Sequence, residues 1–310
     1  MAAPIVVTGA GGFIGRALVE RLASRGTRVL AVLRQPAALA GGEPRVIGDV
    51  TAATDWAPLF AGASAVVHLA SGAHAPVADE QRWIERDAAA AAALARQALS
   101  AGVSRVVLLS SIKVLGERTT GLPFRAHQQP APEDVYGLAK WRMEETMRAV
   151  LGDTLAVIRP PLVYGPGVKA NFLALLRLVD SGLPLPFASI DNRRSLVFLD
   201  TLVDLIETAL THPAAAGGTY LLRDDAEVST PELVRRIARA LGRPARLLPC
   251  PPALLRLAAA AAGRAGAADR LVSSLRVDDL ATRERLGWRP RVSLDDGLAA
   301  TVRWYRQRRR

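Results

Sequence analysis

Three glycines near the start of the chain constrain its fold more than any other feature. The segment TGAGGFIG ends a short apolar run, Ile5–Thr8, and opens an amphipathic stretch, Gly12–Ser24, with Gly9, Gly12 and Gly15 at intervals of three. In a strand–loop–helix unit, the first glycine permits the tight turn, the second lets the backbone approach a pyrophosphate, and the third brings helix and strand together. The helix N-terminus then faces the phosphates. The opening therefore predicts a dinucleotide-binding unit.

Apolar runs alternate with amphipathic stretches over the first 160 residues. Strands that are buried on both faces of a parallel sheet read as continuous apolar runs bounded by glycine and acidic residues. We expect strands at Ile5–Thr8, Arg28–Leu33, Arg45–Ile47, Ala65–Leu69, Arg105–Ser110 and Thr154–Arg159, and further helices at Gln81–Ala101 and Asp134–Val150. This alternation predicts an α/β fold with a doubly wound parallel Rossmann sheet.

The pattern loosens after Pro160, where proline and glycine cluster. Further strands are expected at Ser195–Leu199 and Gly218–Leu222, and helices at Thr201–Leu210, Thr230–Leu241, Asp278–Leu286 and Leu294–Arg306. We predict that residues 1–165 form the NAD(P)-binding Rossmann domain, to which 195–212 return. Residues 166–194 and 213–310 are predicted to form a smaller, discontinuous C-terminal substrate lobe.

Composition excludes several classes of protein. Half of the 310 residues are hydrophobic, which excludes a disordered chain, and the single cysteine, Cys250, excludes an internal disulfide. We also expect no metal site, since one thiol cannot form a cysteine-rich one. We expect no membrane span, because no apolar stretch reaches about 18 residues, and a cytoplasmic location, because the opening lacks a basic n-region. The net charge of +11 comes mainly from scattered arginines. We therefore expect no nucleic-acid partner, and we interpret Arg306–Arg310 as a solvated tail.

The end of the second expected strand bears on the choice of cofactor. NAD enzymes usually place an Asp or Glu there for the ribose hydroxyls, whereas this chain has Leu33 followed by Arg34. Arg34, with Arg16, is available for a 2′-phosphate; the alternative is that both are solvated arginines in an arginine-rich protein. The cofactor is therefore NADP or NAD, with NADP slightly favoured.

Other turns at the same sheet edge suit the rest of a dinucleotide. Asp49 and Val50 follow the third strand and suit the adenine, and the Ala70–Ser71 turn follows the fourth and suits the pyrophosphate and ribose. The residues expected to bind the cofactor are Gly9, Gly12, Phe13, Ile14, Gly15, Arg34, Asp49, Val50, Ala70, Tyr136, Lys140 and Pro161.

A phenol, an ammonium group and a hydroxyl indicate the chemistry. Tyr136 and Lys140 in YGLAK stand four residues apart, on one face of a helix, and Ser111 lies 25 residues before Tyr136 at the end of a strand. A free phenol titrates near ~10. Lys140 and the helix N-terminus after Asp134 are both expected to favour the phenolate.

These three residues form the predicted catalytic set. Tyr136 transfers a proton, Ser111 hydrogen-bonds the substrate oxygen, and Lys140 supports the phenol and holds the nicotinamide ribose. A surface tyrosine–lysine pair is the alternative, which the glycine loop and Ser111 disfavour. The set predicts movement of a hydride and a proton at a carbinol or ketone.

Several motifs together resemble the extended short-chain dehydrogenase/reductase family. They are TGAGGFIG, the VVHLA strand, SSIKVLG, YGLAK and RPPLVYGPG, and NRRSLVFLDTLVDLI and LGWRPRVSLDDGL resemble later landmarks of the group. More narrowly, the chain resembles the NAD-dependent epimerase/dehydratase family, with nucleotide-sugar enzymes of the UDP-glucose 4-epimerase type. The resemblance spans nearly the whole length. It implies a Rossmann domain, a nucleotide-sugar lobe, a Ser–Tyr–Lys site, a UDP-sugar substrate and a homodimer formed through two long helices.

The resemblance also suggests residues that bind the substrate. Arg194 in NRRSLV matches an arginine that meets the sugar-nucleotide diphosphate, Asn171 matches an asparagine on the pyrophosphate side, and Arg270 is a candidate for a second clamp. Ser111 completes this set. Guanidinium groups suit diphosphates because they form bidentate bonds. His74 is either directed into the site or an ordinary loop histidine.

Departures from the family pattern leave the exact activity open. Leu115 replaces an aromatic residue, Asp87 stands where many relatives have asparagine, and Leu33 replaces the ribose acid. Weak ribose recognition suits a cofactor that is exchanged in every cycle. We therefore expect reduction of a UDP-4-keto-(N-acetyl)hexose in surface-polysaccharide biosynthesis. The alternative is a UDP-glucose or UDP-N-acetylglucosamine 4-epimerase, and a more remote one is a non-catalytic dinucleotide-binding protein.

Overall fold

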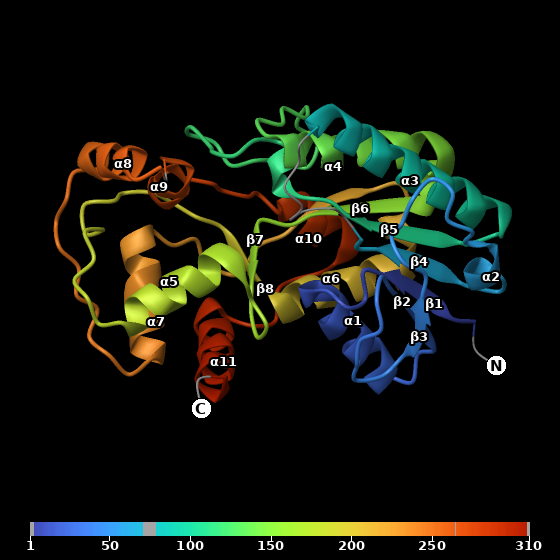
Figure 1. The fold of residues 1–310 in the computed structure, drawn as a ribbon, viewed down its shortest axis with the longest axis horizontal. Coiled ribbons are helices and arrows are strands. Elements are labelled where there is room, and N and C mark those ends of the chain that lie inside the picture. The colour runs from blue at the N-terminus through green and yellow to red at the C-terminus, as the bar shows by residue number, and fades with distance from the viewer. Residues whose placement is uncertain (1–2, 71–78, 264, 309–310) are drawn as a thin grey trace.

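A parallel sheet forms the centre of the larger half of the molecule (Figure 1). The computed structural model describes residues 3–70, 79–263 and 265–308. Within these residues, seven strands pair in the order β3-β2-β1-β4-β5-β6-β9, and every pair is parallel. Their bounds are β1 Ile5–Thr8, β2 Val29–Leu33, β3 Glu43–Val46, β4 Ala65–His68, β5 Arg105–Leu109, β6 Leu155–Arg159 and β9 Thr219–Leu221. The first six strands have the Rossmann order, which confirms the predicted fold class.

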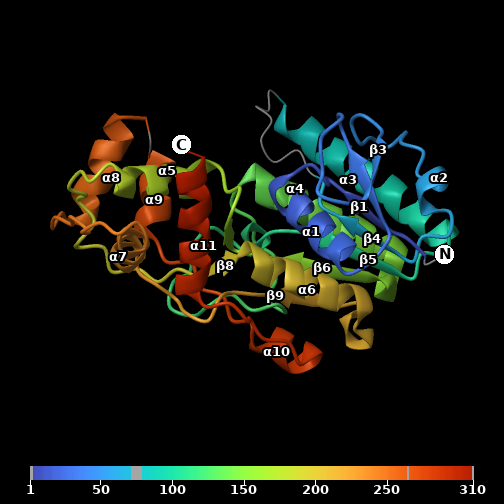
Figure 2. The same cartoon turned by 90° about the horizontal axis from the view of Figure 1, so that it is seen from below.

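Helices cover both faces of this sheet (Figures 1 and 2). One face packs against α1 (Phe13–Ser24) and α6 (Leu199–Thr211), and the other against α2 (Ala57–Phe60), α3 (Glu80–Ser100) and α4 (Val135–Leu151). The central strands carry apolar residues on both sides, as in β2, where all five residues are buried. Such strands need a helical layer on each face, which is why the continuous apolar runs predicted this architecture.

A second group of helices forms the smaller lobe at the left of Figure 1. It contains α5 (Ala170–Asp180), α7 (Thr230–Ala240), α8 (Pro252–Ala261), α9 (Ala265–Val272) and α11 (Leu294–Gln307). A short parallel pair, β7 (Leu162–Tyr164) and β8 (Leu196–Phe198), lies between the lobes. Short 3₁₀ turns occur at η1 (Ile112–Val114), η2 (Gly152–Thr154) and η3 (Pro213–Ala215). None of the helices in the described parts of the chain has the length and hydropathy needed to cross a bilayer.

The boundary predicted for the smaller lobe needs correction at one place. Residues 213–310 were assigned to that lobe, but β9 is the seventh strand of the large sheet, paired with β6. Tyr220, Leu286 and Trp288 pack into the sheet's own core, so α10 (Leu280–Leu286) also belongs with the Rossmann half. A three-residue strand has too little pattern to reveal its partner from sequence. The division into two lobes otherwise stays a prediction.

Candidate active site

The glycine loop has the backbone that a bound pyrophosphate requires. Gly9 has φ +67°, and a Cβ atom there would lie 2.9 Å from the Ala70 nitrogen. A Cβ at Gly15 would lie 2.2 Å from the Gly9 oxygen, so only glycine lets α1 pack this close to β1. Gly12 is the N-cap of α1, and no side chain caps the first backbone N–H groups of this helix. The loop therefore fits the diphosphate of a dinucleotide facing a helix N-terminus.

A cavity of about 490 Å³ opens beside this loop, at the carboxyl edge of the sheet. It brings together five of the predicted cofactor residues from four different segments: Gly9, Arg34, Asp49, Val50 and Ala70. The carboxyl edge of parallel strands is where doubly wound proteins bind nucleotides. These residues therefore fit the adenosine half of a dinucleotide.

The two arginines considered for a 2′-phosphate differ in their surroundings. Arg34 lines the cavity, 73% of its side chain is exposed, and its Nη1 lies 3.8 Å from Asp49. Arg16 instead donates hydrogen bonds from Nε to the Gly11 oxygen (2.9 Å) and from Nη1 to the Ala38 oxygen (2.6 Å). Arg16 is thus engaged with the backbone, which leaves Arg34 as the better placed of the two.

Three other predicted cofactor residues lie around the loop rather than among the residues that line the cavity. Phe13 packs against the cores of both lobes, and Ile14 packs partly buried against the sheet. Pro161 is buried just after β6. Two predicted positions, Ser71 and His74, lie outside the described residues.

The three predicted catalytic residues meet at the carboxyl end of β5. Ser111 caps η1, Tyr136 lies in the first turn of α4, and Lys140 lies one turn further on. The Ser111 and Tyr136 hydroxyl groups are hydrogen-bonded. The Lys140 Nζ lies 5.9 Å from the centre of the Tyr136 ring and donates to the Leu109 oxygen at 2.9 Å. The fold therefore assembles the set that the spacing predicted.

The electrostatics of this set differ from the expectation. Burial, and then Asp134, raise the pKa of Tyr136 to about 12, and the hydrogen bond from Ser111 opposes both. Burial also lowers the pKa of Lys140 to about 8, although Asp87 and Glu144 favour its charged form. In the protein by itself, the pKa of the phenol is therefore raised rather than lowered, whatever support Lys140 and the helix N-terminus give to the phenolate. Desolvation of the phenol outweighs the other effects.

A lysine and an aspartate connect the segments that carry Ser111 and Tyr136. Asp134, the N-cap of α4, accepts a hydrogen bond from the Gly137 nitrogen at 2.7 Å and another from the Lys113 ammonium group. A Cβ atom at Gly137 would lie 2.5 Å from the Lys113 oxygen, so α4 approaches η1 closely. These contacts fix the serine relative to the tyrosine. Sequence reasoning missed the role of Lys113, although it stands only two residues after Ser111.

A buried ion pair lies directly behind Lys140, and sequence reasoning missed it as well. The Glu144 carboxylate is 2.6 Å from Nη2 of Arg159, and the two side chains are 1% and 5% exposed. The Ser110 hydroxyl also donates to Glu144. Glu144 stands one helical turn after Lys140, so it shares the face that carries both catalytic side chains. That spacing of four was the available signal.

A buried histidine lies on the other side of Lys140. His68 at the end of β4 is 2% exposed and shares a 2.8 Å hydrogen bond with Thr8 of β1. Burial, and then Lys140, lower its pKa to about 3. His68 is therefore neutral at physiological pH and joins two neighbouring strands beside the cofactor cavity, which it also lines.

The predicted substrate residues belong to the smaller lobe and its approaches. Arg194 donates from Nη1 to the backbone oxygens of Arg270 (2.5 Å) and Ser273 (3.0 Å), so the structure brings two of these residues together. Burial, and then Arg270, lower the pKa of Arg194 to about 10. Asn171 is exposed in the first turn of α5, next to Ala170, which has φ +48°.

Comparisons with known proteins agree with this arrangement. The NAD dependent epimerase/dehydratase family matches residues 5–222. The chain is 40% identical to a UDP-glucose 4-epimerase from Vibrio cholerae over 315 residues, which cover 98% of this chain and 95% of that protein. A solved structure of MoeE5 in complex with UDP-glucose and NAD is 25% identical with a TM-score of 0.75, covering 99% of this chain and 100% of that one.

A second solved structure shows the same fold at lower identity. The UDP-N-acetylglucosamine 4-epimerase from Bacillus cereus is 20% identical, covers 100% of both chains and has a TM-score of 0.81. Three observations point to the same family. One relative is 40% identical over nearly its full length, the family model matches more than half of the chain, and the site has the Rossmann arrangement. The chain is an enzyme that belongs to the NAD dependent epimerase/dehydratase family.

Proposed function

We propose that this enzyme is an NAD-dependent UDP-hexose 4-epimerase. The observation that carries the proposal is the meeting of Ser111, Tyr136 and Lys140 beside a dinucleotide cavity, in a chain 40% identical to a UDP-glucose 4-epimerase over 98% of its length. MoeE5 binds UDP-glucose and NAD, and it covers the same length of this chain. Both comparisons support a UDP-sugar substrate, and the MoeE5 complex also supports NAD.

The chain's own residues account for the proton at the sugar hydroxyl. When bound, NAD supplies a hydride acceptor at C4 that can return the hydride after the sugar has turned. Tyr136, in its phenolate form, would take the proton of the C4 hydroxyl and, as the phenol, later return it; it lies beside the Ser111 hydroxyl. Ser111 hydrogen-bonds the same substrate oxygen and orients it. Lys140 keeps a positive charge near the phenol, which lowers the cost of forming the phenolate.

The smaller lobe is proposed to hold the diphosphate and the uridine. Arg194, with Arg270 and Asn171, would contact the diphosphate oxygens, since guanidinium groups bind them bidentately. Arg194 is half-buried, and the Arg270 and Ser273 oxygens already hold its guanidinium group in one place, which supports this role.

A reductase of a UDP-4-keto-(N-acetyl)hexose is the second candidate, and one observation favours it. The end of β2 has Leu33 where NAD enzymes usually have a carboxylate, and the exposed Arg34 lines the cavity next to it. A cofactor held weakly at its ribose suits a reductase, which must exchange it each turn. NADP as the preferred cofactor belongs to this candidate.

The two candidates are separated by the cofactor requirement of the purified enzyme. UDP-glucose and UDP-N-acetylglucosamine are incubated with the enzyme without added dinucleotide, and the products are separated from the substrates by ion-pair chromatography. An epimerase forms the C4 epimer under these conditions, with NAD found after denaturation. A reductase leaves both sugars unchanged and oxidises one NADPH or NADH per 4-keto sugar. Failure of both assays with wild-type protein, at activity no higher than Tyr136→Phe, rejects both candidates.

We also propose a homodimer formed through α3 and α4. These long helices pack side by side on one face of the sheet, which leaves their outer sides facing away from it (Figure 2). Sedimentation velocity decides between a dimer and a monomer.

A further inference from the structure

The side chain of Lys113 lies between two carboxylates next to the predicted catalytic set. Its ammonium group donates hydrogen bonds to Asp134, the N-cap of α4, and to Glu117. Burial opposes the charge of this lysine, but the hydrogen bonds to Asp134 and Glu117 raise its pKa above the ordinary value. Lys113 is therefore a cation at physiological pH, and it separates two acidic side chains that would otherwise repel each other.

The cap of α4 places a negative charge close to the phenol of Tyr136. Asp134 stands two residues before Tyr136 and accepts a hydrogen bond from the Gly137 nitrogen at 2.7 Å, so its carboxylate belongs to the turn that carries the phenol. Burial opposes the charge of Asp134, but the hydrogen bonds from Lys113 and Gly137 hold its pKa below the ordinary value. A fixed anion at this place disfavours a phenolate.

The backbone of Lys113 is fixed relative to both catalytic hydroxyl groups. Its nitrogen donates to the Ser111 hydroxyl at 3.3 Å, and its carbonyl oxygen would lie 2.5 Å from a Cβ atom at Gly137. The Lys113 and Asp134 side chains are 29% and 31% exposed, so solvent screens their interaction only in part. The ammonium group is therefore held at the cap, beside the residues that move the proton.

The other cation of the set loses its charge more easily. Burial lowers the pKa of Lys140 to about 8, whereas the pKa of Lys113 is raised. Within the described parts of the chain, other titratable or charged side chains lie on the elements around the first turns of α4. They are Glu144 on α4, Arg86 and Asp87 on α3, His68 on β4, Arg159 on β6, and Glu117, Arg118 and Glu133 between η1 and α4.

We propose that Lys113 is a positioning residue for proton transfer: its ammonium group neutralises the Asp134 carboxylate, so that α4 keeps its acidic cap while the Tyr136 phenolate can form beside it. This role rests on the proposed proton transfer by Tyr136, which the epimerase and the reductase share. Lys113 acts through Asp134 and needs no contact with the substrate. Without it, the same cap would still hold the helix but would repel the charged form of the phenol.

The test removes the two charges singly and together in the full-length enzyme. Lys113→Met removes the cation, Asp134→Asn removes the anion and keeps a good N-cap, and the double variant removes both. Lys113→Arg retains the charge. The matched control is Arg118→Met, which removes a cation from the same loop, where Arg118 is 65% exposed and 4.0 Å from Glu133. The dependence of kcat on pH and the Tm are measured for each protein.

We expect Lys113→Met to move the acidic limb of the kcat profile up by about one pH unit, and Asp134→Asn to move it down, because a partly buried charge is weakly screened. The double variant and Lys113→Arg should return the limb close to its wild-type position, and Arg118→Met should leave it there. An unmoved limb in Lys113→Met overturns the proposal. Equal displacement in Lys113→Met and the double variant also overturns it, because a purely structural contact is not restored by removing the second charge.

A measurement without substrate separates this proposal from the proposed function. Tyr136 is replaced by a difluorotyrosine, whose phenol ionises closer to neutral pH, and its titration midpoint is followed by fluorine NMR in each variant. The midpoint should be highest in Lys113→Met, lowest in Asp134→Asn, and near the wild-type value in the double variant. Any other order overturns the role of Lys113. If wild type turns over no UDP-sugar, the proposed function fails, and this order still decides the role of Lys113.

Discussion

The catalytic residues and the predicted substrate residues are held in place by different means. Tyr136 and Lys140 share α4, a helix fastened to the sheet by a buried ion pair and to η1 through Asp134. Arg194 extends from an extended segment before β8 and is oriented by two carbonyl oxygens at the end of α9. Helix α8, at the outer end of this lobe, has no buried residue. The predicted catalytic residues thus lie on a helix with buried tertiary contacts, and the predicted substrate residues lie on loops and shorter elements.

This comparison predicts which property each substitution changes. Changes on α4 should affect the chemical step or the stability of the fold. Changes around Arg194 should affect substrate affinity. The predictions below run from the largest expected effect to the smallest.

Tyr136→Phe should lower kcat by roughly 10²–10⁴-fold, since it removes the group that carries the proton. Cofactor binding should stay near normal, because the phenol contributes little to holding the dinucleotide. Steady-state kinetics and cofactor titration measure the two effects. Retention of more than about a tenth of the wild-type rate would contradict the catalytic role, because proton transfer alone accounts for more than this.

Glu144→Ala should destabilise the fold by about 3–5 kcal/mol, because it leaves the buried Arg159 guanidinium without its carboxylate. The matched control is Glu145→Ala, the next residue on α4, whose ion pair with Arg142 is exposed and worth at most about 1 kcal/mol. Urea unfolding measures both. Equal destabilisation by the two substitutions would show that the rigidity of α4 does not depend on the buried pair.

Asp224→Asn should change how stability depends on pH. Asp224 lies between the halves, where it accepts hydrogen bonds from the Tyr164 hydroxyl (2.7 Å) and the Phe198 nitrogen (2.9 Å). Burial raises its pKa to about 6. Its folded-state pKa is above the unfolded one, so its stabilising contribution is complete below about pH 4 and is lost as pH rises through about 6.

Asparagine keeps an acceptor for Phe198 and does not ionise. Relative to wild type, Asp224→Asn should therefore gain up to about 3 kcal/mol between pH 4 and pH 7. Urea unfolding at several pH values measures the difference. A constant difference across this range would mean that Asp224 does not titrate in the folded protein.

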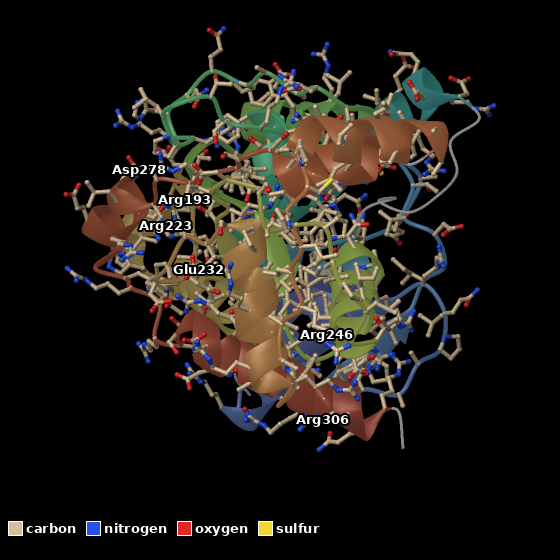
Figure 3. All side chains as sticks on the ribbon, turned by 90° about the vertical axis from the view of Figure 1, so that its left-hand side faces the viewer. Arg193, Arg223, Glu232, Arg246, Asp278 and Arg306 are labelled. Carbon is tan, nitrogen blue, oxygen red and sulfur yellow. The ribbon has the colours of Figure 1, made fainter. Side chains whose placement is uncertain are left out.

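Arg194→Ala should raise the KM for the UDP-sugar by about 10–100-fold, as expected for loss of a charge-assisted contact, and change kcat far less. Arg193→Ala is the matched control, because Arg193 is adjacent and exposed (Figure 3). Thermal unfolding of both variants gives a further check. A lower Tm with an unchanged KM would make Arg194 a residue that only holds α9.

Arg34→Ala should weaken the binding of NADPH by no more than a few-fold and leave the binding of NADH unchanged. An exposed charge contributes about 1 kcal/mol or less to such binding. If the enzyme is the reductase, wild type should bind NADPH at least as well as NADH. Titration of both dinucleotides into both proteins measures this. If NADH binds wild type tenfold better, the interpretation of Leu33 and Arg34 fails and a resident NAD becomes the simpler account.

Sequence patterns predicted the Rossmann half well and the smaller lobe poorly. The predicted strand bounds agree within one residue in β1, β2, β4, β5 and β6, because each of these strands is a buried apolar run, and within two residues in β3. Helix α5 was missed, since proline and glycine surround it, and the bounds of β3 were less accurate because that strand is mostly exposed and lacks an apolar pattern. Local spacing also identified Ser111, Tyr136 and Lys140. These residues lie close together because the predicted sheet places the end of β5 next to α4.

The sequence by itself determined the doubly wound class of the sheet, the glycine loop and the spacing of the predicted catalytic set, because these depend on residue patterns within single strand–loop–helix units. Only the tertiary structure decided the partners of Glu144 and Asp224, the place of β9 and the direction of the Tyr136 pKa. These depend on burial and on groups distant along the chain. The free energy of a charge is set by its surroundings in space, which spacing along the sequence does not encode.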